Sequence, residues 1–308
     1  MFKRSVNLKN STWNLANILI YPVIFLAATP FFINKLGESS FGEWMLINSY
    51  VFISVHIAAF GLGHSLTAHV AHALGEKNDQ KLYAYINSAS GVFFFILLLA
   101  FIIGLFLLLN PLSIEYYFGL NGWKLIGMAT LLIGIKFPEM LYQSIFKGHE
   151  AYEKAAIFNL ANRLVSLGLH IYLVLNAYSL FEIIAASFLT NLIIVILQAV
   201  VIYRGYSNYS FSIFKNYPES KELYNFGFWT WLQTVIAVSA FQIDRFIVAY
   251  FLGTAVVTYY VLAATIANHL HMAFEAVVGW LLPKISRLKA EMKDTLDYYF
   301  VLPDPFQV

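Results

Sequence analysis

Ionisable residues lie well inside several long apolar stretches of this chain: Lys136, Arg163 and the neighbouring pair Asp244 and Arg245. A charged side chain at the centre of a membrane span costs at least about 2.5 to 3.5 kcal/mol, so such residues face other helices or water-filled cavities. Arg163 lies roughly 10 residues, or about 15 Å, from the expected cytoplasmic end of its stretch, too deep for its side chain to reach the surface easily. We therefore interpret Arg163 as lining a hydrated cavity, with a structural ion pair as the alternative.

The other charged residues have spacings that suggest local partners. Lys136 and Glu139 are three residues apart, a spacing at which two side chains meet on one helix face, so we expect them to neutralise each other. Asp244 and Arg245 are adjacent, and their side chains therefore point about 100° apart around a helix. Each of these two is expected to meet a different neighbour.

Polar residues also recur at helical spacing along most of the apolar stretches. The clearest face is in the fifth stretch, with Asn159, Arg163, Ser166 and His170. Other stretches show comparable faces: Asn10, Asn14, Asn17 and Tyr21 in the first; Ser187, Asn191 and Gln198 in the sixth; Gln233 and Asp244 in the seventh; Thr265, Asn268, Met272 and Glu275 in the eighth. Such faces either line a cavity or join helices through hydrogen bonds worth about 0.6 to 2 kcal/mol each.

The elements that carry these residues are predicted to be membrane-spanning helices. Hydrophobic residues make up 60% of the 308-residue chain and charged residues 12%, which is too apolar for a soluble domain. Because lipid cannot satisfy free backbone groups, the stretches must be helical. The sequence predicts an all-α, polytopic membrane protein with about eight transmembrane helices, near residues 12–34, 43–67, 84–109, 122–146, 156–176, 180–203, 225–251 and 257–283. The third is almost wholly apolar and is expected to face lipid.

The distribution of basic residues predicts the orientation. Lysines and arginines outside the spans fall mainly on the side of the N-terminus, and only Lys35 and Lys124 lie on the other side. The positive-inside rule then places both termini in the cytoplasm, in a multi-pass protein of the cytoplasmic membrane.

Several kinds of chemistry are not expected. The chain has no cysteine, which excludes disulfides and thiol catalysis, and its histidines lack metal-ligand spacing. The segments between spans are too short to house a catalytic domain. We therefore expect no enzymatic activity, no cofactor, no metal and no nucleic acid partner.

A weak internal repeat suggests how the spans are grouped. An offset of 216 residues places Trp13 on Trp229, and it likewise pairs other landmarks: Leu36-Gly37 with Leu252-Gly253, Trp44 with Tyr260, Gly63 with Gly279 and Asn17 with Gln233. The repeat predicts a first six-helix bundle in residues 1–215. Residues 216–308 would then hold the first two helices of a second bundle and a cytoplasmic tail, as expected of a C-terminally truncated chain.

These landmarks resemble a known family. The basic first turn, the polar first span, Leu36-Gly37 with Phe41-Gly42 and Trp44, the glycines Gly61 and Gly63, and the amphipathic connection over residues 71–81 are similar to the polysaccharide (O-antigen type) flippase branch of the multidrug/oligosaccharidyl-lipid/polysaccharide exporter superfamily. The seventh and eighth spans fit as well, with Asp244-Arg245 ahead of Leu252-Gly253 and Tyr259-Tyr260.

The resemblance implies a transporter of two six-helix bundles that moves a lipid-linked oligosaccharide across the membrane by alternating access. A cationic cavity between the bundles would hold the carrier's diphosphate and its sugars. Arg163 and Arg245 would attract the diphosphate, because a guanidinium pairs bidentately with phosphate oxygens. Further substrate contacts would come from Asn159, His170, Asn17 and Gln233, and coupling to H⁺ or Na⁺ from Asp244 and Glu275.

Three alternatives remain beside the flippase. A cation-coupled multidrug antiporter would use Asp244 or Glu275 for ion exchange. An integral membrane enzyme would need clustered charged residues on a sizeable loop, and the chain has none. Because part of a second bundle would be missing, the chain is also expected either to be a nonfunctional truncated flippase or to need a partner chain that supplies helices. Besides the lipid-linked oligosaccharide, its expected partners are membrane lipids.

Overall fold

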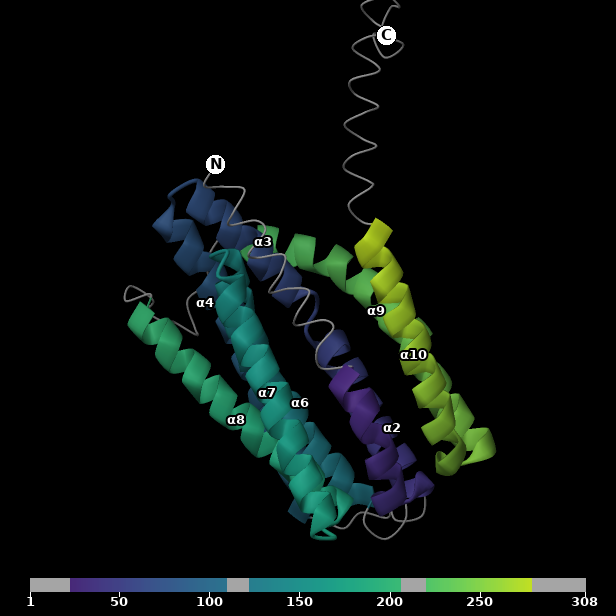
Figure 1. The fold of residues 1–308 in the computed structure, drawn as a ribbon. Coiled ribbons are helices and arrows are strands. Elements are labelled where there is room, and N and C mark those ends of the chain that lie inside the picture. Colours follow the sequence, from purple (N-terminus) through teal and green to yellow (C-terminus); the bar gives the residue numbers. More distant parts are fainter. Residues whose placement is uncertain (1–22, 110–121, 206–219, 279–308) are drawn as a thin grey trace, which may run out of the picture. The chain divides into compact units, whose positions relative to one another are not determined.

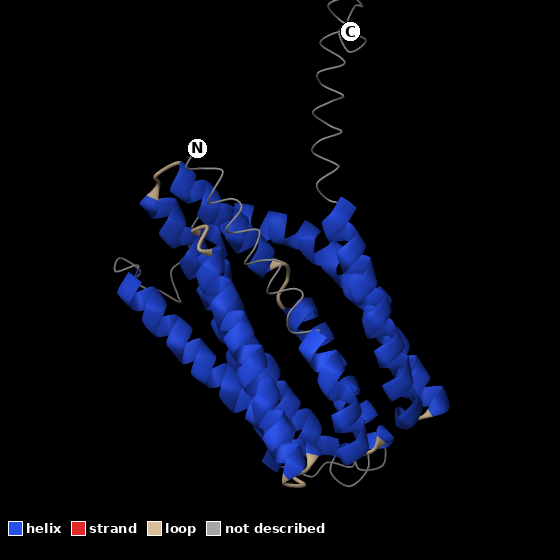
Figure 2. Ribbon diagram, in the orientation of Figure 1, coloured by secondary structure: helices blue, strands red, loops and turns tan. Residues whose placement is uncertain are grey.

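The described part of the chain consists of helices and the short turns between some of them. The computed structural model describes residues 23–109, 122–205 and 220–278, and in the last segment it describes side chains for residues 221–268. No strand occurs within these ranges (Figure 2). A first helix spans Val23–Leu36, and those that follow are labelled in Figure 1: α2 (Glu38–Ala58), α3 (Leu62–Gly75), α4 (Asp79–Leu109), α6 (Gly122–Gly148), α7 (Tyr152–Leu175), α8 (Leu180–Gly205), α9 (Ser220–Leu252) and α10 (Thr254–Val278).

The helices confirm the prediction of a polytopic, all-α membrane protein. Among the described residues, α4, α6, α7, α8 and α9 are each long and apolar enough to cross a membrane, and α2 with α3 qualifies as a sixth, bent span. Shorter apolar helices, Val23–Leu36 and Thr254–Asn268, lie where the first and eighth spans were predicted. Residues 12–22 of the predicted first span are outside the described part.

The second span is not the single helix that was predicted. It begins at Glu38 and breaks after Ala58, and α3 continues at an angle of 51°. Gly61 adopts a left-handed conformation with φ of 67°, and a Cβ added there would lie 2.1 Å from the carbonyl oxygen of Gly227 in α9. A neighbouring helix that is distant in sequence therefore requires glycine at the break, which local periodicity could not reveal.

α6 forms the centre of the packing, and α4 covers one side of it. In the most apolar window of α6, 67% of residues are buried, against 17% for α4. The two helices approach closely where Gly104 meets Leu131 and where Gly127 meets Leu108. The opposite face of α4 exposes large apolar side chains, as expected of a lipid-facing span: Phe94, Phe95, Leu98, Leu99, Ile102, Ile103, Leu105, Phe106 and Leu109.

α9 runs antiparallel along α2. The indole of Trp231 donates to the carbonyl of Ile57 (2.8 Å), and farther along both helices Arg245 donates to Ser49 (2.9 Å). At the start of α2, Gly42 lies directly against the backbone of Thr254, the first residue of α10. The described residues up to Val261 form one compact unit, and those from Leu262 onward form a second.

The geometry agrees with the 216-residue repeat. Gly37 and Gly253, which the offset pairs, have φ of 82° and 83°, and each donates its N–H four residues back, to Ile33 and to Ala249. Thr258 donates to the carbonyl of Glu38, and the offset maps this contact onto the one between Gly42 and Thr254. The bundle boundary at residue 215 stays a prediction.

Candidate functional site

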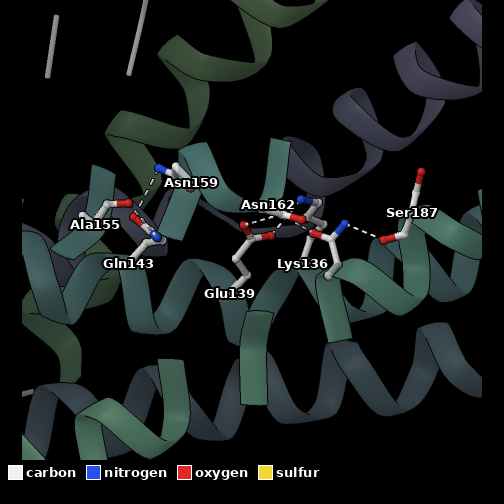
Figure 3. Close-up of polar contacts among 8 residues, drawn as sticks. Lys136, Glu139, Gln143, Ala155, Asn159, Asn162 and Ser187 are labelled. Carbon is white, nitrogen blue, oxygen red and sulfur yellow. Dashed lines mark hydrogen bonds and ion pairs between the residues drawn. The ribbon is translucent and has the colours of Figure 1, made fainter. Parts of the chain in front are cut away.

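A buried polar network joins α6, α7 and α8. The Lys136 ammonium donates to one carboxylate oxygen of Glu139 (2.7 Å), as predicted from their spacing. Asn162 of α7 donates its amide to the other oxygen (3.3 Å) and to the side-chain oxygen of Asn191 in α8 (2.9 Å). Asn191 donates in turn to the backbone carbonyl of Ser187 (2.7 Å). In Figure 3, Glu139 and Asn162 point toward each other from facing helices.

The orientation of the Asn162 amide is fixed by its neighbours. Both groups that it contacts, the Glu139 carboxylate and the Asn191 carbonyl oxygen, are acceptors, so the NH₂ group must face them. The Oδ1 atom of Asn162 is then buried without a hydrogen-bond partner in the described part of the chain. The two Glu139 oxygens and the Asn191 oxygen each accept a hydrogen bond, so the Asn162 oxygen is the one acceptor of the described network that stays without a donor.

Asn159 and His170 contact neighbouring helices. Asn159 donates to Gln143 of α6 (3.4 Å), and Gln143 donates to the backbone of Ala155 (3.3 Å). His170 is buried, with its Nε2 atom 2.9 Å from the hydroxyl of Ser187 and its ring edge-on to Trp44 of α2. In this conformation both side chains contact neighbouring helices. Of the two roles considered for a polar stripe, cavity lining and helix packing, these contacts correspond to helix packing.

The predicted stripe on α7 is not uniform in its surroundings. Arg163 is exposed, whereas His170 is buried and Asn159 is half-buried. The buried network uses Asn162, which the sequence analysis did not select. Asn159, Asn162 and Ser166 are also spaced for one helix face, so this alternative stripe was available in the sequence.

A second polar group lies between α2, α9 and the start of α10. As predicted, Asp244 and Arg245 meet different neighbours: Asp244 accepts a hydrogen bond from the Tyr260 hydroxyl, and Arg245 donates from one terminal nitrogen to Ser49 (2.9 Å). The Nε atom of Arg245 is buried and has no partner among the described residues. The guanidinium thus has remaining capacity to donate to an anion.

Comparison with known protein families gives a match over most of the chain. The family model described as "Polysaccharide biosynthesis protein" matches residues 8–289. The chain belongs to the polysaccharide biosynthesis protein family. No curated protein and no solved structure matches it.

Of the remaining site candidates in this member of the polysaccharide biosynthesis protein family, Gln233 belongs to neither polar group. Gln233 is exposed on α9. Asn17 lies outside the described residues, and Glu275 lies in α10 beyond the last described side chain. Within the described ranges, His, Asp and Glu side chains form no group suited to hold a metal ion.

Proposed function

We propose that the chain is a flippase that carries a polyprenyl-diphosphate-linked oligosaccharide across the cytoplasmic membrane for surface polysaccharide synthesis. Membership of the polysaccharide biosynthesis protein family, over residues 8–289 of a chain with several apolar spans, is the observation that carries the proposal. The proposal includes both termini on the cytoplasmic side, an O-antigen type of substrate and no enzymatic role.

Arg245 is the residue that we propose for diphosphate binding. It lies within a span, between α2 and α9, and its buried Nε is without an acceptor among the described residues. A guanidinium keeps its charge and offers a planar set of donors to phosphate oxygens, which strengthens binding in a site with little water. Arg163, exposed on α7, is proposed as a second cationic group for the same substrate.

Complementation tests this function. We would express the full-length gene product in a cell that lacks its own flippase for a matching substrate, and measure surface polysaccharide together with the lipid-linked precursor. We expect wild type to restore export and Arg245→Ala to reduce it at least about tenfold, because a charge-assisted bond to phosphate is lost. Arg204→Ala, at the exposed end of α8, is the matched control. Normal export by Arg245→Ala at equal protein level would remove Arg245 from the site.

A cation-coupled antiporter is the second candidate, and the carboxylate of Asp244 within α9 is the observation that favours it. In that case Asp244→Asn would abolish the dependence of drug efflux on a H⁺ or Na⁺ gradient. Restored polysaccharide export without gradient-driven drug efflux would exclude this candidate.

A further inference from the structure

α9 contacts both arms of the bent second span. On the α2 side, the Trp231 indole donates to the carbonyl of Ile57 (2.8 Å), and its ring stacks on Phe60 with the ring centroids 5.6 Å apart. On the α3 side, the Ser65 hydroxyl donates to the carbonyl of Leu223 (2.6 Å). One helix, distant in sequence, therefore bridges the break between α2 and α3.

The backbone at the break is left-handed over two residues. Phe60 has φ of 47° and Gly61 has φ of 67°. This conformation is unfavourable for a residue as bulky as Phe60. The facing glycine of α9 lets the two backbones meet, since a Cβ added at Gly227 would lie 3.0 Å from the Phe60 carbonyl oxygen. Contact with α9 thus accompanies a conformation that the break does not favour by itself.

The carbonyl of Ile57 has two possible donors. In an unbroken α-helix it would accept from the N–H of Gly61, four residues farther on. At the break, the indole N–H of Trp231 takes this place. Within a membrane span a carbonyl without a donor is costly, so one of the two donors is required. A bent and a straight form of the span would differ in which N–H group this carbonyl accepts from.

We infer that the second span is a two-state element whose bend is set by α9. The span stays bent while Trp231 donates to Ile57, and it straightens, with Gly61 as the donor, when α9 withdraws. A movement of α9 thereby changes the direction of α3 relative to α2. This inference concerns the helices alone and does not depend on the transported substrate.

Distance measurements between spin labels test this element. The chain has no cysteine, so Asn48→Cys in α2 and Ala71→Cys in α3, both at exposed positions, give a single labelled pair in the purified full-length protein. Removing a bend of 51° should lengthen the distance between these two backbone positions by about 3 Å, at a rise of about 1.5 Å per residue.

Trp231→Phe keeps an aromatic ring but lacks the N–H. We expect it to raise the share of the longer distance at least about twofold, because the bent form loses a hydrogen bond. Trp229→Phe, at an exposed position of α9 two residues away, is the matched control and should keep the wild-type distances.

Two results would overturn the inference. One is a Trp231→Phe protein with wild-type distances, since the indole would then not set the bend; the other is a rise of the longer distance in both variants, since it would then not depend on this N–H. If Trp231→Phe cannot be purified, Gly61→Ala decides. Its added Cβ disfavours the left-handed backbone and the contact with α9, so the longer distance must gain share, and wild-type distances would overturn the inference.

Discussion

Asn162 connects three helices through one amide group. Its NH₂ faces the acceptors of Glu139 and Asn191, so the residue donates a hydrogen bond to each of two buried oxygens. The sequence predicted that α7 has a polar face and that Lys136 would pair with Glu139. It could not choose between the face that contains Arg163 and the one that contains Asn162, because both fit a helical period equally well.

Replacing Asn162 should therefore destabilise the protein. In Asn162→Ala the Glu139 and Asn191 oxygens lose a donor while still buried, which costs about 1 to 3 kcal/mol for each such group. Asn159→Ala is the matched control, since it removes one longer bond (3.4 Å) at a half-buried position. We expect a clearly lower unfolding temperature for Asn162→Ala in purified protein. Equal temperatures for the two variants would show that the network contributes little to stability.

At the scale of elements, hydropathy located the spans, because burial in lipid requires long apolar helices whatever their neighbours are. The break between α2 and α3 was not predicted. In the sequence Gly61 was a landmark of the family resemblance, and nothing in its local sequence distinguishes a glycine at a packed position from one at a break. The left-handed φ and the contact with Gly227 both depend on α9, which is distant in sequence.

The break makes a prediction about glycine requirements. Gly61→Ala adds a Cβ at a position with φ of 67° and a backbone oxygen 2.1 Å away, so it should cost at least about 1 to 3 kcal/mol. Gly75→Ala, at the end of α3, has no atom within 4 Å of the added Cβ and should be nearly neutral. Unfolding temperature and membrane yield of the two variants provide the comparison. A Gly61→Ala protein as stable as Gly75→Ala would mean that α9 can withdraw from the break.

At the scale of the whole molecule, the 216-residue repeat is visible in the sequence and has a counterpart in the backbone geometry of the structure. The offset pairs Gly37 with Gly253, and these residues share both backbone conformation and hydrogen bonding. The offset also maps Glu38 onto Thr254 and Gly42 onto Thr258, so the two contacts between the starts of α2 and α10 are equivalent to each other. At the same place, the hydroxyl oxygens of Ser39 and Thr254 lie 2.7 Å apart. The sequence predicted that Gly37 and Gly253 are equivalent positions but did not predict this contact, because a repeat offset gives equivalent positions and no distances.

If the chain works by alternating access, as its resemblance to flippases implies, we predict that the starts of α2 and α10 separate in one half of the transport cycle. The chain has no cysteine, so Ser39→Cys combined with Thr254→Cys introduces a single possible intramolecular disulfide, at positions close enough to form one. We expect oxidation to cross-link the variant and to abolish polysaccharide export, and reduction to restore it. The single variant Ser39→Cys should export under both conditions. Full export by the cross-linked protein would mean that this contact persists throughout transport, and that the moving interface lies elsewhere.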